Sequence, residues 1–162
     1  MTGSNFIRAL GPGEEEQVDT LLRDAFGGQD EAMLVRRLRK DRSIAGEMVL
    51  ARDGALIGYY ALSWMKAPKR WLCLAPVAVA PPQQRQGYGR RMLGQLSAWA
   101  ALSGSYVVVL GQPEVYGRAG FSLDRARRLD APYPTENLLL AGPGDDVPKQ
   151  RLIYPAAFAG LD

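Results

Sequence analysis

The chain has 162 residues, with 20 basic and 17 acidic side chains and a net charge of +3. This length suits one domain with a proper core, and the mild charge argues against a nucleic-acid or membrane partner. Cys73 is the one cysteine and there is no histidine, which excludes an intrachain disulfide and argues against a metal site. No stretch resembles a membrane span or a signal peptide, so we expect a cytoplasmic protein.

The first half of the chain predicts a strand, two helices and a β-hairpin. Helical spacing of apolar residues and stop signals such as Gly27-Gly28 mark the helices. Asp53-Gly54 is a favoured two-residue hairpin turn, because both residues tolerate positive φ. The expected elements are a strand at 5–10, a helix ending at Phe26, a helix at 30–40, and hairpin strands at 47–52 and 55–64.

A group of cations occupies the end of the second predicted helix and the residues after it. The solvated face of a helix explains such a run, and no aromatic platform is interleaved with it. A nucleic-acid-binding domain is therefore the least favoured of the functions that we consider for the whole chain. The cations are Arg36, Arg37, Arg39, Lys40 and Arg42.

The centre of the chain joins three pieces without a break. An apolar run at 71–79 predicts a buried strand, a turn rich in Pro and Gly follows at 80–89, and an amphipathic helix continues to about Leu102. The first N–H groups of a helix have no intrahelical partner, and the helix dipole is positive there. A strand, a Gly-rich loop and a helix in this order form a device that can hold phosphate. A helix entry with two flexible glycines and no ligand is the alternative.

The second half predicts short strands and a structured tail. The wholly apolar run at 106–110 predicts a buried strand, which makes a βαβ crossover and hence a parallel pair with 71–79. A helical turn at 114–119 and a polar strand at 122–129 should follow. Two further strands are expected at 138–140 and 152–154. We expect the extension 130–162 to pack on the domain, because it is rich in Leu and aromatic residues.

The loop sequence itself narrows the phosphate ligand. Gln84-x-x-Gly87-x-Gly89 matches neither a Walker P-loop nor a dinucleotide fingerprint. With its flanking strand and helix, it resembles the acyl-CoA motif of the GNAT superfamily of N-acyltransferases. Tyr116-x-x-x-Gly120-Phe121 resembles a second GNAT motif, about thirty residues further on. The VLGxPxxY run and the ending Tyr154-Pro155-x-x-Phe158 are similar to an uncharacterised bacterial branch of that superfamily.

The resemblance implies a fold and a co-substrate. The fold would be one α+β domain over 1–162, with three layers and a mixed, mostly antiparallel sheet of six to seven strands flanked by helices. Its fourth and fifth strands would form a splayed parallel pair, and a β-bulge near Pro76 would help to open it. Acetyl-CoA would be the co-substrate, no metal would be needed, and the protein would be a monomer or homodimer.

The resemblance also assigns residues to the co-substrate. Val77, Ala78 and Val79 would pair with the pantetheine arm through their backbone, although an ordinary core strand would read the same way. The pyrophosphate loop would consist of Arg85, Gln86, Gly87, Tyr88, Gly89 and Arg90. Backbone N–H groups would supply much of its contact, so the side chains of Gln86 and Tyr88 should matter little.

The implied reaction is direct attack of a primary amine on the thioester in a ternary complex. Tyr116 would be the general acid for the departing thiolate, with a packing tyrosine as the alternative. The acceptor would be the amine of a small molecule or of a peptide or protein. It would be held by residues 27–31, the hairpin and residues 133–137. A non-catalytic acyl-CoA-binding or sensor module is the alternative function.

The sequence does not identify the base that accepts the amine proton. Cys73 can titrate, but its apolar flanks predict a buried and inert thiol. Gln112 stands where similar sequences often carry Asp, which removes one carboxylate. The remaining acidic candidates are Glu31, Glu47 and Glu114. Proton loss through ordered water is the default, because holding amine and thioester together already supplies much of the rate.

Overall fold

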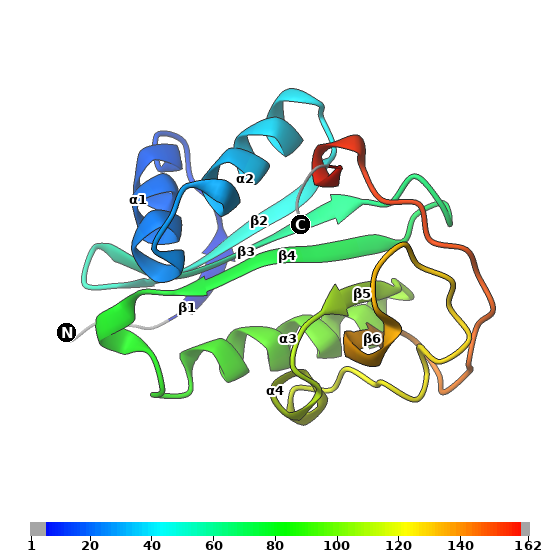
Figure 1. The fold of residues 1–162 in the computed structure, drawn as a ribbon. Helices are drawn as coiled ribbons and strands as arrows, with labels where there is room; N and C mark the ends of the chain where they lie inside the picture. Colours follow the sequence, from blue (N-terminus) through cyan, green and yellow to red (C-terminus); the bar gives the residue numbers. More distant parts are fainter. Residues whose placement is uncertain (1–5, 160–162) are drawn as a thin grey trace.

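A sheet of six strands in the order β1-β2-β3-β4-β5-β6 runs through the middle of the protein, between two layers of helices (Figure 1). The structure is a computed structural model, and it describes residues 6–159. Every neighbouring pair is antiparallel except β4 and β5, which are parallel. The strands are β1 (Phe6–Ala9), β2 (Ile44–Arg52), β3 (Ala55–Trp64), β4 (Leu72–Val79), β5 (Val107–Leu110) and β6 (Leu138–Ala141). The predicted α+β fold with a mixed, mostly antiparallel sheet is confirmed; Asn5, predicted to open the first strand, lies outside the described residues.

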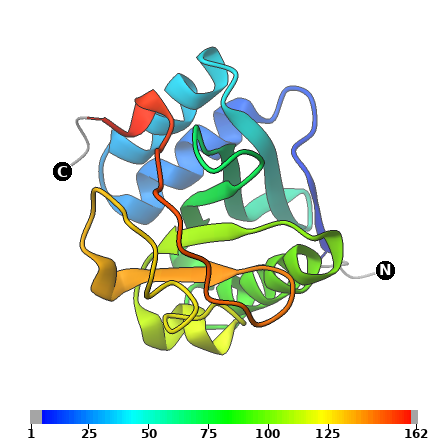
Figure 2. The same ribbon diagram turned by 90° about the vertical axis from the view of Figure 1, so that its right-hand side faces the viewer.

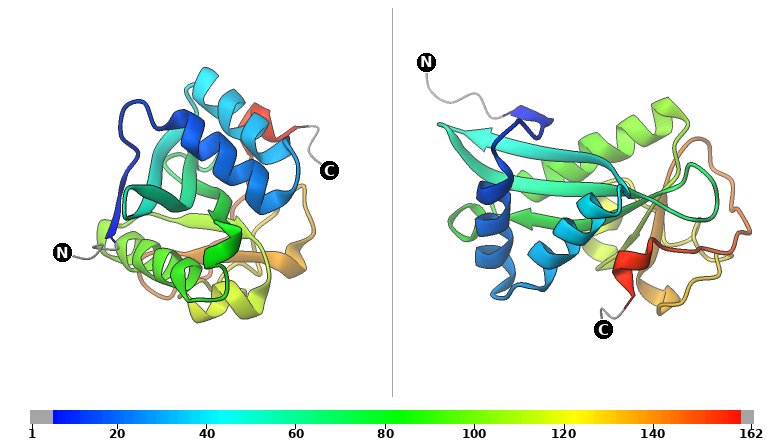
Figure 3. Two further views of the ribbon diagram at one scale, coloured as in Figure 1. Left: turned by 90° about the vertical axis from the view of Figure 1, so that its left-hand side faces the viewer. Right: turned by 90° about the horizontal axis from the view of Figure 1, so that it is seen from above.

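Two helix pairs cover opposite faces of the sheet (Figures 1 and 3). The pair α1 and α2 lies on one face, and the pair α3 and α4 lies on the other. Val18, Leu21 and Leu22 form the buried side of α1, which ends at Gly27 with φ of 73°. The bounds are α1 (Glu15–Phe26), α2 (Asp30–Lys40), α3 (Tyr88–Ser103) and α4 (Pro113–Arg118), with short 3₁₀ turns η1 (Pro81–Gln83), η2 (Thr135–Asn137) and η3 (Ala156–Phe158).

The strands β4 and β5 meet only at their beginnings. Leu72 pairs with Val107 and Cys73 with Val108, and no further pair follows. From Leu74 onward, β4 continues beside β3 alone, while β5 continues beside β6 (Figure 1). The predicted splay of this parallel pair is therefore present.

A bulge in β4 accompanies the divergence. Tyr60 of β3 faces Val77 of β4, whereas Leu62 faces Leu74. Two steps along β3 thus correspond to three along β4, which places one extra residue at Ala75 and Pro76. A bulge bends its strand and increases the local twist. The bulge predicted near Pro76 is confirmed.

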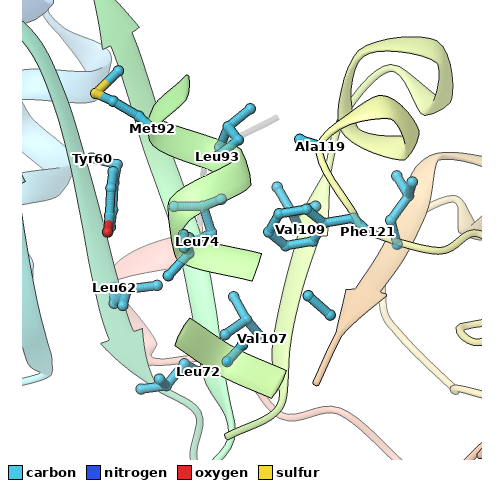
Figure 4. Packing of buried hydrophobic residues seen from close by; sticks show 14 of the residues in the cluster. Tyr60, Leu62, Leu72, Leu74, Met92, Leu93, Val107, Val109, Ala119 and Phe121 are labelled. Atoms are coloured by element: carbon cyan, nitrogen blue, oxygen red, sulfur yellow. The ribbon is translucent and has the colours of Figure 1, made fainter. Parts of the chain in front are cut away.

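Three clusters of buried side chains hold the layers together. The α3-side core joins Leu72 and Leu74 of β4, Val107 and Val109 of β5, and Met92 of α3 (Figure 4). The α1-side core packs α1 and α2 on β2 and β3. The tail-side core joins Cys73 and Val108 to α2, β6 and the C-terminal segment. Successive residues of β4 and β5 alternate between the two faces, as the pleat of a strand requires.

The C-terminal segment crosses the protein on the α1–α2 face. After β6 it runs from the β5–β6 half of the sheet up to α2, where η3 lies (Figure 2). Leu152, Tyr154 and Phe158 are buried in the tail-side core. Arg125 holds the loop after β6, because its guanidinium donates to the carbonyl oxygens of Gly142 and Pro143 at 3.1 and 2.7 Å.

Two predicted strands are wrong. In the segment 122–129 only Ser122 makes a bridge, to Leu140, and the rest forms successive turns. The Ser122 hydroxyl accepts a hydrogen bond from the Arg125 backbone N–H at 3.0 Å, which starts these turns. In the segment 152–154 only Ile153 makes a bridge, to Ala67, because its neighbours are loops rather than strands.

No helix within residues 6–159 is long and apolar enough to cross a membrane.

The cations at the end of α2 are partly neutralised within the fold. Arg36 pairs with Asp19 at 2.6 Å, and Arg39 pairs with Glu47 at 2.7 Å. These contacts tie α2 to α1 and to β2. They favour the structural interpretation of the charge run over a nucleic-acid interface.

The turn between β1 and α1 generates a prediction about pH. Both guanidinium N–H groups of Arg8 donate to the Glu14 carboxylate, at 2.8 and 2.7 Å, and the Gly11 backbone N–H donates to it at 2.6 Å. The Arg8 hydrogen bonds, followed by that of Gly11, lower the pKa of Glu14 from 4.5 to about 2. A lowered carboxylate pKa stabilises the fold above its ordinary value, and this stabilisation is lost as the pH falls toward the folded value.

We therefore expect Glu14→Gln to be less stable than wild type at pH 7 and to lose less stability between pH 4.5 and pH 2. Urea unfolding over this range measures the difference. Glu16→Gln, at an exposed position in the same helical turn, is the matched control and should follow the wild-type curve. Equal pH dependence in Glu14→Gln and wild type would contradict the assignment.

Candidate active site

The free edge of β4 is the first part of the site. Val77, Ala78 and Val79 pair with Tyr60, Tyr59 and Gly58 of β3 on one side only. On the side of β5 they have no strand partner, because the pairing ends at Cys73. Val77 and Val79 are half-buried against the α3-side core, whereas Ala78 is buried in the α1-side core. The side chains of this stretch thus belong to the core, while its backbone forms an open edge of the sheet.

The loop after β4 turns the chain into α3. Arg85 and Gly87 have left-handed backbone, with φ of 65° and 88°. Gly87 is the residue before the helix, and its carbonyl accepts the Arg91 N–H at 3.0 Å. The N–H groups of Tyr88, Gly89 and Arg90 therefore precede the first intrahelical bond and are available to an anion. The helix begins at Tyr88, so Gly89, predicted in the turn, lies in the first turn of α3.

Several side chains of this loop are engaged by the protein itself. The Gln84 amide donates to the carbonyl of Val79 at 2.9 Å, and the Gln86 amide donates to that of Pro82 at 3.1 Å. Arg52, at the end of β2, donates to the Tyr88 hydroxyl at 2.7 Å. These bonds fix the loop from inside and bring the hairpin turn beside it. Arg85 and Arg90 are exposed and add positive charge at the start of α3.

Tyr116 lies in α4, just beyond the end of β5. Its ring is half-buried and meets Phe121 edge to face, with centroids 5.9 Å apart. Its hydroxyl makes no hydrogen bond within residues 6–159, and burial raises the pKa of Tyr116. The side chain is thus a protonated donor with an unoccupied hydroxyl at the end of the strand that diverges from β4.

Two glycines and a serine fix the position of Tyr116, and sequence reasoning missed their role. A Cβ on Gly111 would lie 2.2 Å from the Tyr116 ring, so only glycine admits the ring there. Gly120 has φ of 105°, and a Cβ on it would lie 2.5 Å from the Ser97 hydroxyl oxygen. That hydroxyl donates to the Ala119 carbonyl and joins α3 to α4. In the sequence, Gly111 stands only as the glycine of the VLGxPxxY run.

The candidate bases differ in burial and in hydrogen bonding. Burial raises the pKa of the Cys73 thiol to about 12, which agrees with an inert thiol. Glu47, one of the acidic candidates, accepts hydrogen bonds from Arg39 at 2.7 Å and from the Tyr59 hydroxyl at 2.6 Å. Glu31 and Glu114 lie in the first turns of α2 and α4, where acidic residues complement the helix dipole.

A sheet that splits between a bulged fourth strand and a parallel fifth strand, above a helix that begins in a glycine loop, defines the GNAT class of fold. The model of the acetyltransferase (GNAT) family matches residues 15–121. The uncharacterized N-acetyltransferase YhbS of Escherichia coli strain K12 is 33% identical over 133 residues, which cover 79% of this chain and 80% of YhbS. The chain therefore belongs to the GNAT family of acetyltransferases.

Solved structures agree with this membership. The structure of Escherichia coli YhbS in complex with CoA has a TM-score of 0.87 and 28% identity, over 100% of this chain and 94% of that one. A GNAT acetyltransferase from Brucella melitensis in complex with acetyl-CoA has a TM-score of 0.79 and 27% identity, over 96% of this chain and 98% of that one. Within residues 6–159 no group of three or more Cys, Asp or Glu side chains could hold a metal ion.

The position of Cys73 generates a prediction about its reactivity. A buried thiol with a raised pKa reacts only when the protein opens. Native protein should therefore react with a thiol reagent such as Ellman's reagent only slowly, and protein in urea should react at once. Cys73→Ala should leave acetyl transfer within a few-fold of wild type. Rapid labelling of native protein, or a hundredfold loss of turnover with CoA binding intact, would contradict this assignment.

Proposed function

We propose that the protein transfers an acetyl group from acetyl-CoA to a primary amine, by direct attack in a ternary complex. The observation that carries the proposal is the edge of β4 that has no strand partner beyond Cys73 and leads into the glycine loop before α3. The complexes of the two relatives with CoA and acetyl-CoA support the choice of co-substrate.

The co-substrate would lie along the opening between the strands. The pantetheine arm carries amide groups, and it would pair with the backbone of Val77, Ala78 and Val79 as an added strand. The pyrophosphate would meet the backbone N–H groups at the start of α3, with Arg85 and Arg90 beside it. Gln86 and Tyr88 are already held by Pro82 and Arg52, so their side chains are proposed to fix the loop rather than to grip the ligand.

The chemistry would take place where β4 and β5 have separated. The neutral amine forms a bond to the thioester carbonyl carbon, and the carbonyl oxygen becomes an oxyanion that needs hydrogen-bond donors. The C–S bond then breaks, and Tyr116 would give its proton to the thiolate of CoA. A raised pKa keeps Tyr116 protonated at neutral pH. We assign the amine proton to water, because Cys73 is buried and Glu47 is held by Arg39 and Tyr59.

The acceptor would approach from the α1–α2 face. A hollow of about 510 Å³ lies there in the C-terminal segment, and Tyr133, Tyr154 and Phe158 are among its lining residues. The rings of Tyr133 and Tyr154 meet edge to face at 5.0 Å. Ala75, at the bulge of β4, packs against the same tail-side core. Aromatic faces attract ammonium groups, so this wall suits an amine substrate.

Binding of the co-substrate is the first test. Acetyl-CoA or CoA should raise the melting temperature of wild type by mass action on the folded state. Gly89→Glu should abolish the shift, because it places an anion in the first turn of α3. A Cβ at this position meets only Val79 at 3.6 Å, so the fold should tolerate the change.

Gly28→Glu is the matched control, since a Cβ there has nothing within 4 Å and the residue lies between α1 and α2. It should keep the wild-type shift. If wild type shows no shift at millimolar CoA, the proposed co-substrate is wrong.

Turnover by Tyr116→Phe separates an enzyme from a sensor. If Tyr116 protonates the leaving thiolate, kcat should fall by about 10²–10⁴ while CoA affinity stays close to wild type. Acetyl transfer to the best amine of a panel, beside a CoA titration, measures both. Tyr106→Phe is a control, because its hydroxyl meets Asp146 on the surface. An unchanged kcat in Tyr116→Phe would leave Tyr116 as a packing residue. If wild type binds CoA but acetylates no amine, the sensor function is favoured.

A further inference from the structure

A second hollow lies on the α3 face, away from the opening between β4 and β5. Its volume is about 850 Å³, within the roughly 300–1,000 Å³ range of small-molecule sites. The floor comes from β2, β3 and the start of β4, including Met48, Leu62 and Leu72, and one wall is the C-terminal half of α3. Tyr60, Leu62 and Leu72 follow one another along this face of the sheet (Figure 4). We call this hollow the α3 groove.

The α3 groove is separate from the proposed active site. Ser97 of α3 donates a hydrogen bond to the carbonyl of Ala119, at the end of α4, which carries Tyr116. Trp99 lines the groove and is two residues further along the helix, or about 200° around its axis. The groove is thus on the side of α3 away from α4. It also lies toward the Leu72 end of β4, whereas the strands open toward Val79.

Large apolar side chains at the α3 groove are left uncovered. Trp64 and Trp99 both line it, and they are 46% and 45% exposed. Tryptophan residues bury large areas when they have a partner, and two of them beside one concave surface mark a binding site. Trp71, the third tryptophan, is buried and stacks on Tyr106, so it does not contribute to this surface.

The charge at the lining of the α3 groove is positive. Arg70 is the charged residue among those lining it, and no acidic residue lines it. Arg70 makes no ion pair within residues 6–159, and neither do Lys66 and Lys69 of the same loop. A guanidinium suits a carboxylate, because two of its N–H groups can donate to both oxygens.

A buried tyrosine supplies a second donor. Tyr60 is only 5% exposed and lines the groove, and its hydroxyl makes no hydrogen bond within the described part of the chain. Among the described residues, the side-chain oxygens that are both fully buried and without a hydrogen bond belong to Ser63 and Tyr154. The Tyr60 hydroxyl is not one of them, so a ligand in the groove can reach it. Burial raises the pKa of Tyr60 to about 12, so the hydroxyl stays a donor.

We propose that the α3 groove binds an amphiphilic carboxylate, with its apolar body between Trp64 and Trp99 and its carboxylate at Arg70. The charge of the Lys66–Arg70 loop and the apolar floor together argue for this occupant over an uncharged or cationic one. The site is independent of acyl transfer, since none of the residues assigned to acetyl-CoA lines it.

Intrinsic tryptophan fluorescence tests the proposal directly, because two of the three tryptophans line the groove. Decanoate, below its micelle concentration and with saturating CoA present, should change the emission in a saturable way. Decanol and decyltrimethylammonium, with the same chain and no anionic group, should bind more weakly. Arg70→Gln should weaken decanoate binding about tenfold or more, as expected for a charge-assisted hydrogen bond. Lys69→Gln, a neighbouring cation outside the lining, should keep affinity within about twofold.

A blocking variant completes the test. A Cβ on Gly46 has nothing within 4 Å and the residue lines the groove, so Gly46→Phe should fill it while the melting temperature and the CoA shift stay normal. Decanoate binding should then disappear. Three results would overturn the proposal: unchanged binding in Gly46→Phe, equal binding of the cationic amphiphile, or displacement of decanoate by CoA. Emission that changes with protein concentration alone would also overturn it, because a second copy of the chain would then occupy the groove.

Discussion

The separation of β4 from β5 is the constraint on which the rest of the structure depends. Two paired residues hold the strands together at their beginnings, and both strands then continue without each other. Backbone N–H and C=O groups along the two new edges must find water or a ligand, because buried unpaired groups are costly. The bulge at Ala75 and Pro76 turns β4 away at this point, and Pro76 has no N–H to offer a partner strand. An opening of this kind persists only if other contacts hold the two halves of the sheet.

Those contacts come from both faces. On one face α3 lies under both halves, so that Leu74 of β4 and Val109 of β5 pack into the same core (Figure 4). On the other face the C-terminal segment performs the same task, because it joins Cys73 and Val108 to Leu152 and Tyr154. The segment is therefore part of the site's framework as well as its proposed acceptor wall. Its richness in Leu and aromatic residues follows from this position between two diverging strands.

Local patterns in the sequence were enough to predict the helices and strands that bury one face. Helical spacing located α1, α2 and α3, and Asp53-Gly54 located the hairpin turn, with φ of 52° and 80°. The segments 122–129 and 152–154 were mispredicted, because their conformation depends on distant partners. Ser122 caps a turn that Arg125 ties to residues 142–146, and Ile153 meets a loop rather than a strand. The role of Gly111 was also missed, although it is close to Tyr116 in the sequence, because only the folded chain shows the Tyr116 ring against it.

The site divides its tasks between local and distant parts of the chain, and this division explains what the sequence could predict. The glycine loop is specified locally: Gln84 and Gln86 bond to carbonyls within five residues, so its shape needs little from the rest of the fold. Tyr116 also needs a distant part of the chain: Gly111 and Phe121, which are near it in the sequence, admit its ring and meet it edge to face, but Ser97 of α3 holds the end of α4. The proposed acceptor wall depends on still more distant contacts, since Tyr133 and Tyr154 meet only after the tail has crossed the sheet. With the acceptor site proposed here, specificity for the acceptor would reside in the part of the chain that local sequence patterns describe least well.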